Sequence, residues 1–376
     1  MSKSIDDAMG NLRALERAIA EGPHDAVIAV SPENVRYVGD VHISTQTTIR
    51  DRLALIVWVK GRAPVFVLCA VEEAYVRAHS WISEIRPFKE FVTAPMAVVA
   101  DLLAELGLAR GNIGIELDYL AATYLDDLKA RLPELNVTSC TKVFAEARMI
   151  KTTREKELLA HAYRATEKAL LATYATIHEG ETEKSMANRL AGAIMHSGAE
   201  LVAFLHINAG PNTGYPHMAP GDYRVKRGDI VKADVGGWYR EYITNVGRTA
   251  KLGAPSAEDL SYWRRLRAIH HEIIGMLRPG NTGRQLFERA TLLHKQADLP
   301  FPYAHNGHGV GLQVHEHPLV NPFEEIPYRV GMVSTVETRV RFVGKVGYHM
   351  EDLVEITEGA PRILSDAFDN EEIFVI

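Results

Sequence analysis

The chain has 376 residues, of which 47% are hydrophobic and 24% charged, a balance typical of a globular protein with room for two domains. Its formal net charge of −6 argues against a nucleic-acid partner and an anionic membrane surface, because both favour a basic face. Cys69 and Cys140 are its only cysteines, which excludes a disulfide scaffold and a cysteine zinc ribbon. No apolar run approaches the ~18–20 residues of a membrane span, and the first residues lack a signal-peptide pattern. We therefore expect a cytoplasmic protein.

The first part of the chain alternates between strand-like and helix-like patterns. Residues 25–30, 53–59 and 64–69 are short apolar runs of strand length, and the Gly-Arg pair at 61–62 predicts a hairpin. The run 96–107 is helical and is ended by a glycine. Strands joined both by hairpins and by helices indicate a mixed sheet covered by helices.

The composition changes near 145–160, where the chain becomes charged and loses its long apolar runs. Thr153, followed by Glu155 and Glu157, indicates the start of a helix. We place the domain boundary here, with domains at 1–150 and 151–376. The second domain shows two similar halves, each a pair of amphipathic helices followed by a strand-rich stretch: 153–178, 182–197 and 202–249, then 256–277, 282–297 and 304–357.

Four polar residues stand out because they interrupt apolar or glycine-rich segments of this second domain. Asp234, Glu337 and Glu351 lie within strand-like runs, and His308 lies in the run NGHGVG. A buried charge costs several kcal/mol unless it is paired or bound to metal. Strand carboxylates with a histidine form a ligand set suited to Mn, Fe, Co or Zn. Each residue alone is more often structural, so the prediction depends on their occurring together.

The motifs occur in an order that resembles the creatinase/Xaa-Pro peptidase family of pita-bread metallohydrolases, which includes aminopeptidase P and prolidase. They are SPENVRYVGD, EARMIKTTREKELLAHA, KRGDIVKADVGGWYREYITNVGRT, HNGHGVGLQVHEHP, GMVSTVE and GYHMED. The resemblance covers nearly the whole chain. It implies an α+β protein, in which a pita-bread catalytic domain follows a smaller α/β creatinase-type N-terminal domain.

The resemblance also assigns roles to particular residues. The family's metal ligands fall on Asp234, Asn245, His308, Glu337 and Glu351. Two histidines that face the scissile group fall on His217 and His315. In the family the metal activates water and polarises the carbonyl, a glutamate handles the proton, and the histidines hold the oxyanion and the leaving nitrogen.

Three departures from the family pattern affect these expectations. Asn245 stands where the family has a bridging aspartate, and an amide offers only one acceptor oxygen, so we expect one tight metal site and a weak or absent second. Glu337 is followed by Thr338 rather than by proline. His349 stands where proline-processing members often carry arginine, so a guanidinium clamp for a carboxylate is lost. These changes put proline specificity in question more than hydrolysis.

We therefore predict a metal-dependent hydrolase of a C–N bond, similar to Xaa-Pro peptidases, that uses Mn, Co, Fe or Zn on a short peptide or small molecule. Two alternatives remain open: a metal-free hydrolase of a small nitrogenous metabolite, similar to creatinase or ectoine hydrolase, and a non-catalytic peptide-binding protein. The resemblance also implies a homodimer. In creatinase an arginine similar to Arg52 reaches the partner's site, although Arg52 could equally be a surface residue before a strand.

Overall fold

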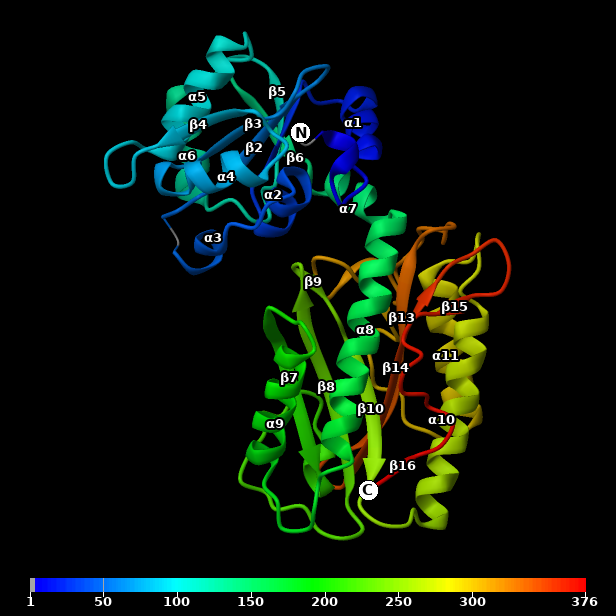
Figure 1. Ribbon diagram of the computed structural model, residues 1–376. Helices are drawn as coiled ribbons and strands as arrows, with labels where there is room; N and C mark the ends of the chain where they lie inside the picture. The colour runs from blue at the N-terminus through cyan, green and yellow to red at the C-terminus, as the bar shows by residue number, and fades with distance from the viewer. Residues whose placement is uncertain (1–3, 50) are drawn as a thin grey trace. The chain divides into compact units, whose positions relative to one another are not determined.

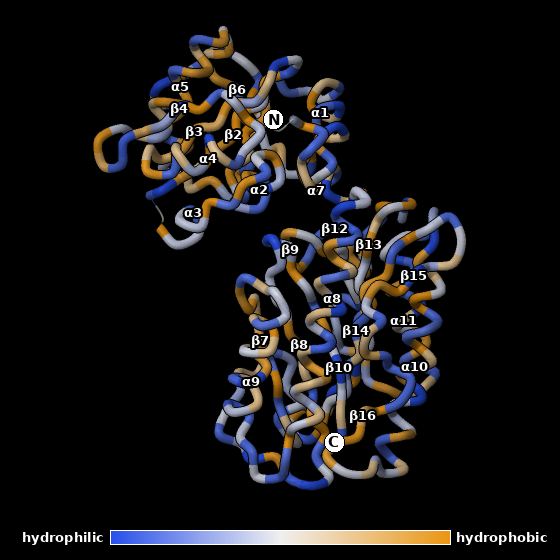
Figure 2. Tube along the Cα trace, viewed as in Figure 1, coloured by the Kyte–Doolittle hydropathy of each residue, from blue (hydrophilic) through white to orange (hydrophobic). Residues whose placement is uncertain are grey.

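A computed structural model describes residues 4–49 and 51–376 (Figure 1). The chain divides into two compact units, Met1–Arg148 and Met149–Ile376. Hydrophobic segments concentrate in the interior of each unit, and hydrophilic residues lie along loops and outer helix surfaces (Figure 2). No helix in the described ranges combines the length and the apolar character needed to cross a membrane.

The first unit is built on a six-stranded sheet with the order β4-β3-β2-β1-β5-β6. Its strands are β1 (Ala26–Ala29), β2 (Leu55–Val59), β3 (Val65–Cys69), β4 (Glu84–Phe88), β5 (Asn112–Ile115) and β6 (Asn136–Ser139). The sheet is mixed, because β2 is antiparallel to both β1 and β3 while the other pairs are parallel. The predicted strands and hairpin are confirmed, and Gly61 adopts a φ of +72° that favours glycine in this turn.

Helices pack around this sheet and enclose an aliphatic core. The elements are η1 (Ile5–Asp7), α1 (Leu12–Glu21), α2 (Pro32–Gly39), α3 (Ser44–Thr48), η2 (Ala70–Glu72), α4 (Glu73–His79), α5 (Pro95–Glu105), α6 (Ala122–Arg131) and α7 (Thr141–Met149). The helix predicted at 96–107 is α5. Cys69 and Cys140 are buried and unpaired, so both serve as packing residues.

The second unit contains the two predicted helix pairs, each starting at a side-chain cap. They are α8 (Thr153–Tyr174) with α9 (Glu183–His196), and α10 (Ala257–Gly275) with α11 (Gly283–Gln296). Thr152 caps α8 and forms a capping box with Glu155, which confirms the predicted helix start. Thr182 and Thr282 cap the second helix of each pair. Each of them also forms an isolated antiparallel β-bridge with a later residue, Thr182 with Arg224 and Thr282 with Pro327. The two halves therefore repeat the same local structure.

The second unit is built on an antiparallel sheet, in which the main strands are hydrogen-bonded in the order β13-β14-β10-β8-β7. The strands and short elements are β7 (Leu201–Ala209), η3 (Gly210–Gly214), β8 (Ile230–Tyr239), β9 (Tyr242–Ile243), β10 (Val246–Lys251), β11 (His308–Gly309), β12 (Glu316–Leu319), β13 (Val333–Phe342), β14 (Val346–Glu355), β15 (Arg362–Ile363) and β16 (Phe374–Val375). The helices contact the sheet, α8 against β8 and β10 and α10 against β13 and β14 (Figure 1).

Buried ionic contacts identify which face of the sheet the helices cover. Arg248 of β10 contacts Glu167 of α8 and Asp352 of β14, and Asp352 also contacts His270 of α10. Successive side chains of a strand point to opposite faces, so Gly247 and Glu351 belong to the other face. That other face carries the predicted site.

Candidate active site

Strand register brings the predicted carboxylates into one row across the sheet. Glu337 pairs with Glu351, Glu351 with Gly247, and Gly247 with Asp234. Residues that lie directly opposite each other in antiparallel strands share a face. The row therefore presents three carboxylates, and Gly247 in its middle adds no side chain.

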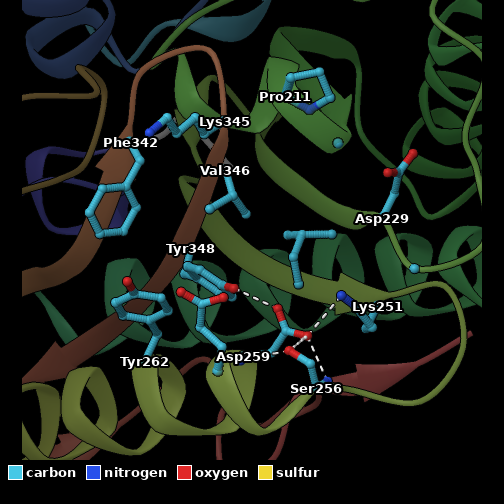
Figure 3. A pocket seen from close by; sticks show the side chains of 14 residues that line it. Pro211, Asp229, Lys251, Ser256, Asp259, Tyr262, Phe342, Lys345, Val346 and Tyr348 are labelled. Carbon is cyan, nitrogen blue, oxygen red and sulfur yellow. Dashed lines mark hydrogen bonds and ion pairs between the residues drawn. The ribbon is translucent and has the colours of Figure 1, made fainter.

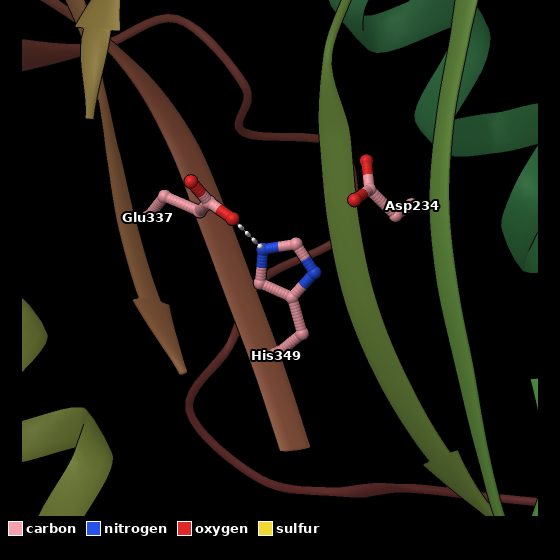
Figure 4. Close-up of side chains that lie close together, drawn as sticks. All are labelled: Asp234, Glu337 and His349. Carbon is pink, nitrogen blue, oxygen red and sulfur yellow. Dashed lines mark ion pairs between the residues drawn. The ribbon is translucent and has the colours of Figure 1, made fainter. Parts of the chain in front are cut away.

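His349 completes a cluster with two of these carboxylates. Asp234, Glu337 and His349 each offer a ligand atom, and these atoms lie within 4.8 Å of one another. Figure 4 shows His349 directed toward Glu337, with Asp234 facing them from β8. His349 Nε2 lies 3.2 Å from Glu337 Oε1. The sequence reading treated His349 only as a lost arginine, so it missed this position.

The remaining predicted ligands lie beside this cluster. His308 Nε2 is 3.6 Å from Glu351 Oε1 and 3.3 Å from Asn245 Nδ2. The other ring nitrogen, His308 Nδ1, is 3.0 Å from the carbonyl oxygen of Gly309. Donation from Nδ1 to this carbonyl leaves the Nε2 lone pair directed to the site, as in metal-binding histidines. All five predicted ligand positions therefore converge.

Unsatisfied polar atoms indicate that this cluster is built around a cation. Both carboxylate oxygens of Glu351 and Oδ1 of Asn245 are buried and accept no hydrogen bond from any described residue. Burial, and then the charges of Glu337 and Asp234, raise the pKa of Glu351 well above its usual value. Burial also lowers the pKa of His308 to about 3, which keeps it neutral, the form that binds metal. The residues present therefore fit a divalent ion.

Three basic residues occupy positions next to the carboxylate row. Arg339 lies opposite His349 and Arg341 lies opposite Gly347, while Lys232 precedes Asp234 by two residues on β8. Arg339 Nη1 is 2.6 Å from Glu337 Oε2. Burial alone would raise the pKa of Glu337, but Arg339 and His349 outweigh it and hold that pKa well below its usual value.

Lys232 is buried and bonded only to backbone oxygens among the described residues. Its Nζ donates to the carbonyl oxygens of Tyr215 at 2.7 Å and Pro216 at 3.2 Å. Burial, and then the nearby Arg341, lower the pKa of Lys232 to about 7. The sequence reading missed Lys232, Arg339 and Arg341 as site residues. The available signal was charge at alternate positions of a buried strand, as in Lys232-Ala-Asp234 and Glu337-Thr-Arg339-Val-Arg341.

The two predicted catalytic histidines lie at the edge of the ligand row. His217 follows η3 on an exposed loop, and its ring centroid is 5.2 Å from that of His206, which pairs with Asp234 in the sheet. The His315 ring is 4.2 Å from that of His308. His305, which the sequence reading missed, brings Nδ1 to 3.6 Å from Glu337 Oε2.

A buried ion pair supports the loop that carries His315. Lys151 Nζ lies 2.7 Å from Glu316 Oε2, and both side chains are almost fully buried. Glu316 Oε1 accepts hydrogen bonds from the backbone N–H groups of Leu312 and Gln313. Lys151 is the last residue of the motif EARMIK, so this motif ends in a contact with the loop that carries His315.

Two further features involve none of the residues of this cluster. Arg52 is in the first unit, where its Nε is 2.9 Å from Glu90 Oε1. A cavity of ≈ 570 Å³ is lined by residues that include Lys251, Asp259 and Tyr348 (Figure 3). Asp259 is 2.6 Å from the Tyr348 hydroxyl and 2.8 Å from Lys251 Nζ. None of the predicted ligands or catalytic histidines lines this cavity.

A sheet with helix pairs on one face and a row of carboxylates and histidines on the other defines a metallohydrolase. The chain belongs to metallopeptidase family M24, which it matches over residues 157–358, and residues 12–150 match the creatinase/prolidase N-terminal domain. These findings confirm the predicted resemblance, the α+β fold and the metal-dependent hydrolysis of a C–N bond.

Several relatives are similar to nearly all or to a large part of the chain. Xaa-Pro dipeptidase of Pyrococcus furiosus is 30% identical over 67% of this chain and 73% of its own length. The probable dipeptidase PepE of Mycobacterium tuberculosis is 27% identical over 84% of both chains. Among solved structures, dipeptidase PepE of Mycobacterium ulcerans has a TM-score of 0.86 at 28% identity, covering 97% of this chain and 96% of its own. Prolidase of Pyrococcus furiosus has a TM-score of 0.80 at 26% identity, covering 93% and 99%.

Proposed function

We propose that this protein is a dipeptidase that cleaves short peptides, with Xaa-Pro dipeptides as the first substrates to test. The observation that supports this most strongly is the convergence of Asp234, Glu337 and Glu351 with His308 in one buried row. Relatives named Xaa-Pro dipeptidase and dipeptidase PepE add support for the substrate class.

The proposed ligands are Asp234, Asn245, His308, Glu337 and Glu351, and we add His349 because of its position in the cluster. A bound divalent ion, with manganese as the first choice, would supply Lewis acidity and an activated water. Asn245 contributes one oxygen where a carboxylate would contribute two, so we propose one tight ion and at most one weak one.

The chain's own residues perform the remaining steps. The Glu337 carboxylate, held by Arg339, accepts the proton of the attacking water. His217 and His315 lie at the edge of the row, where an imidazole can donate a hydrogen bond to the developing oxyanion or a proton to the leaving nitrogen. Each such contribution is worth roughly 10²–10⁴ in rate.

The variant His217→Ala tests this assignment. We expect kcat on Ala-Pro to fall by about two orders of magnitude, with metal content and melting temperature near those of the wild type. The exposed His196 at the end of α9 provides the matched control, His196→Ala, which should keep full activity. If His217→Ala keeps its activity and merely melts earlier, His217 is a packing residue and the mechanism lacks this acid.

A metal-free hydrolase of a small nitrogenous compound is the second candidate. Asn245 is neutral where the family has an aspartate, so the ligand set has one negative charge fewer. Arg339 also pairs with Glu337, so a basic side chain already neutralises part of the negative charge that two metal ions would otherwise neutralise. Elemental analysis of the purified protein, with activity measured before and after chelation, separates the two candidates. Full activity without bound metal would favour the second.

The assembly, the location and the domain limits are further parts of the proposal. We propose a homodimer by analogy with the family, which light scattering would reject if the mass in solution were near the 41.8 kDa of one chain. Two unpaired buried cysteines support a reducing compartment such as the cytoplasm. We keep 1–150 and 151–376 as the proposed domain limits.

A further inference from the structure

We propose that Arg341 forms a subsite for a carboxylate of the substrate, so that the preferred substrates are those that carry a carboxylate at this position. This inference rests on the proposed function, because it names the substrate class of the same site. It concerns a residue to which neither metal binding nor proton transfer assigns a role.

Arg341 is a guanidinium without a carboxylate of its own. It lies on β13, four residues after Glu337, so it is on the same face of the sheet as the ligand row. Its Nε atom is buried and has no hydrogen-bond partner, and its guanidinium makes no hydrogen bond or ion pair with any residue in the described ranges. The residue as a whole is half-buried, and an arginine that is partly withdrawn from water usually has such a partner.

The surroundings of Arg341 keep its side chain beside the site. The carbon atoms at the centre of the Arg339 and Arg341 guanidinium groups lie 4.4 Å and 5.4 Å from the ring centroid of Tyr303. Gly347 of β14 lies opposite Arg341. A Cβ atom added to Gly347 would lie 2.2 Å from the carbonyl oxygen of Thr213 in η3 and 3.4 Å from Arg341 Cγ, so η3 and the Arg341 side chain are both close to this glycine. Arg341 therefore lies next to η3, the segment that leads into the His217 loop.

The charges of the site leave room for an anion. The carboxylates of Asp234, Glu337 and Glu351 share their face of the sheet with three basic residues, Lys232, Arg339 and Arg341. Arg339 is already paired with Glu337, and Lys232 donates to two backbone carbonyls. A divalent ion at the carboxylates would leave a surplus of positive charge, which a carboxylate group of the substrate would offset.

A carboxylate is the anion that best fits this position. A guanidinium presents planar paired donors that match the two oxygens of a carboxylate. The carboxylate could belong to the leaving amino acid, as the free C-terminus of a dipeptide, or to an acidic side chain on the acyl side. A guanidinium would bind a carboxylate at either of these two positions in the same way. Substrates that carry the carboxylate at only one position distinguish the two cases.

The experiment compares matched substrates on the manganese-loaded protein. Ala-Pro and Ala-prolinamide test a leaving-group carboxylate, and Asp-prolinamide and Asn-prolinamide test an acyl-side carboxylate. Each pair is assayed with the wild type, Arg341→Met, the charge-retaining Arg341→Lys, and the control Lys345→Met. Lys345 is an exposed cation in the turn between β13 and β14, so its removal changes the net charge without changing the row.

We expect the wild type to prefer the acid member of one pair, with Arg341→Met lowering kcat/KM for that member about 10- to 100-fold, mainly through KM. The neutral member should change less than about 3-fold, and Arg341→Lys should fall between the two. The proposal is overturned if the wild type does not discriminate within either pair, or if Arg341→Met weakens acid and amide equally.

Binding of L-proline and L-prolinamide by calorimetry separates this proposal from the proposed function. If no peptide is cleaved but proline binding is lost in Arg341→Met, the dipeptidase proposal fails and the carboxylate subsite stands. If proline binds equally to the wild type and to Arg341→Met, the leaving-group subsite is rejected whatever the activity. Melting temperatures of all variants verify that each one is folded.

Discussion

Lys232 Nζ lies 2.7 Å from the carbonyl oxygen of Tyr215, and this contact ties the strand of Asp234 to the loop of His217. A second bond, to the Pro216 carbonyl, reaches the residue immediately before His217. A buried lysine normally costs free energy, because its charged form is desolvated. Its presence here is consistent with a role in positioning the loop.

Lys232→Met should therefore reduce activity without loss of stability. Replacing a buried charge with an apolar side chain of similar length is often neutral or stabilising, so the melting temperature should stay equal or rise. The loop should become more mobile, and kcat/KM should fall about 10- to 100-fold as His217 loses its placement. Hydrogen exchange at residues 215–220 measures the mobility directly. Lys226→Met, at an exposed lysine just before β8, is the control. Unchanged exchange and activity would show that Lys232 does not position this loop.

Gly247→Ala should weaken metal binding by displacing His349. A Cβ at position 247 would lie 2.7 Å from His349 Cε1 and 2.8 Å from Nε2, so the imidazole must move away from the row. We expect the affinity for Mn²⁺ to fall about 10- to 100-fold and stability to fall by about 1–3 kcal/mol. Calorimetric titration measures the affinity. Gly275→Ala, where the added Cβ meets nothing within 4 Å, should leave it unchanged. An unaltered affinity in Gly247→Ala would remove His349 from the proposed ligand set.

Asn245→Asp should strengthen a second metal site. The Oδ1 atom of Asn245 is buried without a hydrogen-bond partner among the described residues, and Nδ2 faces His308. An aspartate would add a negative charge and a second acceptor oxygen. Titration of the wild type with Mn²⁺ or Co²⁺ should show one tight site and at most one weak one, and the variant should show a stronger second site. Two equal high-affinity sites in the wild type would contradict this prediction.

Asp352→Asn should lower stability at neutral pH and flatten its acid dependence. Asp352 Oδ1 lies 2.7 Å from Arg248 Nη2, and Oδ2 lies 2.9 Å from His270 Nε2. Burial would raise the pKa of Asp352, but Arg248 and His270 outweigh it and hold the pKa well below its usual range. Because the folded pKa is lower than the unfolded one, the stabilisation is present above about pH 4 and is lost as the pH falls.

Urea unfolding at pH 7, 5 and 3 measures this effect. Breaking the buried pair should cost about 3–5 kcal/mol at pH 7, and the loss of stability between pH 5 and pH 3 should be smaller in the variant than in the wild type. Asp366→Asn removes an exposed partner of Arg164 and should cost at most about 1 kcal/mol. Equal acid dependence in the wild type and Asp352→Asn would assign the acid sensitivity to other groups.

Local sequence patterns determined much of the fold and the principal ligands. Apolar runs marked β1, β2 and β3, and Thr153 with Glu155 marked the first turn of α8, although the capping residue itself is Thr152. Asp234, Glu337 and Glu351 stood out because each carboxylate interrupts a strand that enters a core. These features depend on neighbours along the chain, so a single sequence contains them.

Only the tertiary structure determined which side chains meet. The alternation of a strand indicates which residues share a face, but the pairing of β14 with β13 and β10 depends on long-range packing and register. This register places Gly247 beside His349, which opens the space that lets the imidazole reach Glu337. It also places Arg341 opposite Gly347 and leaves its guanidinium without a carboxylate partner in the described chain. The alternation along each strand places His349 and Arg341 on the same face as the ligand row, but the contact of His349 with Glu337 and the missing partner of Arg341 follow only from the register between strands.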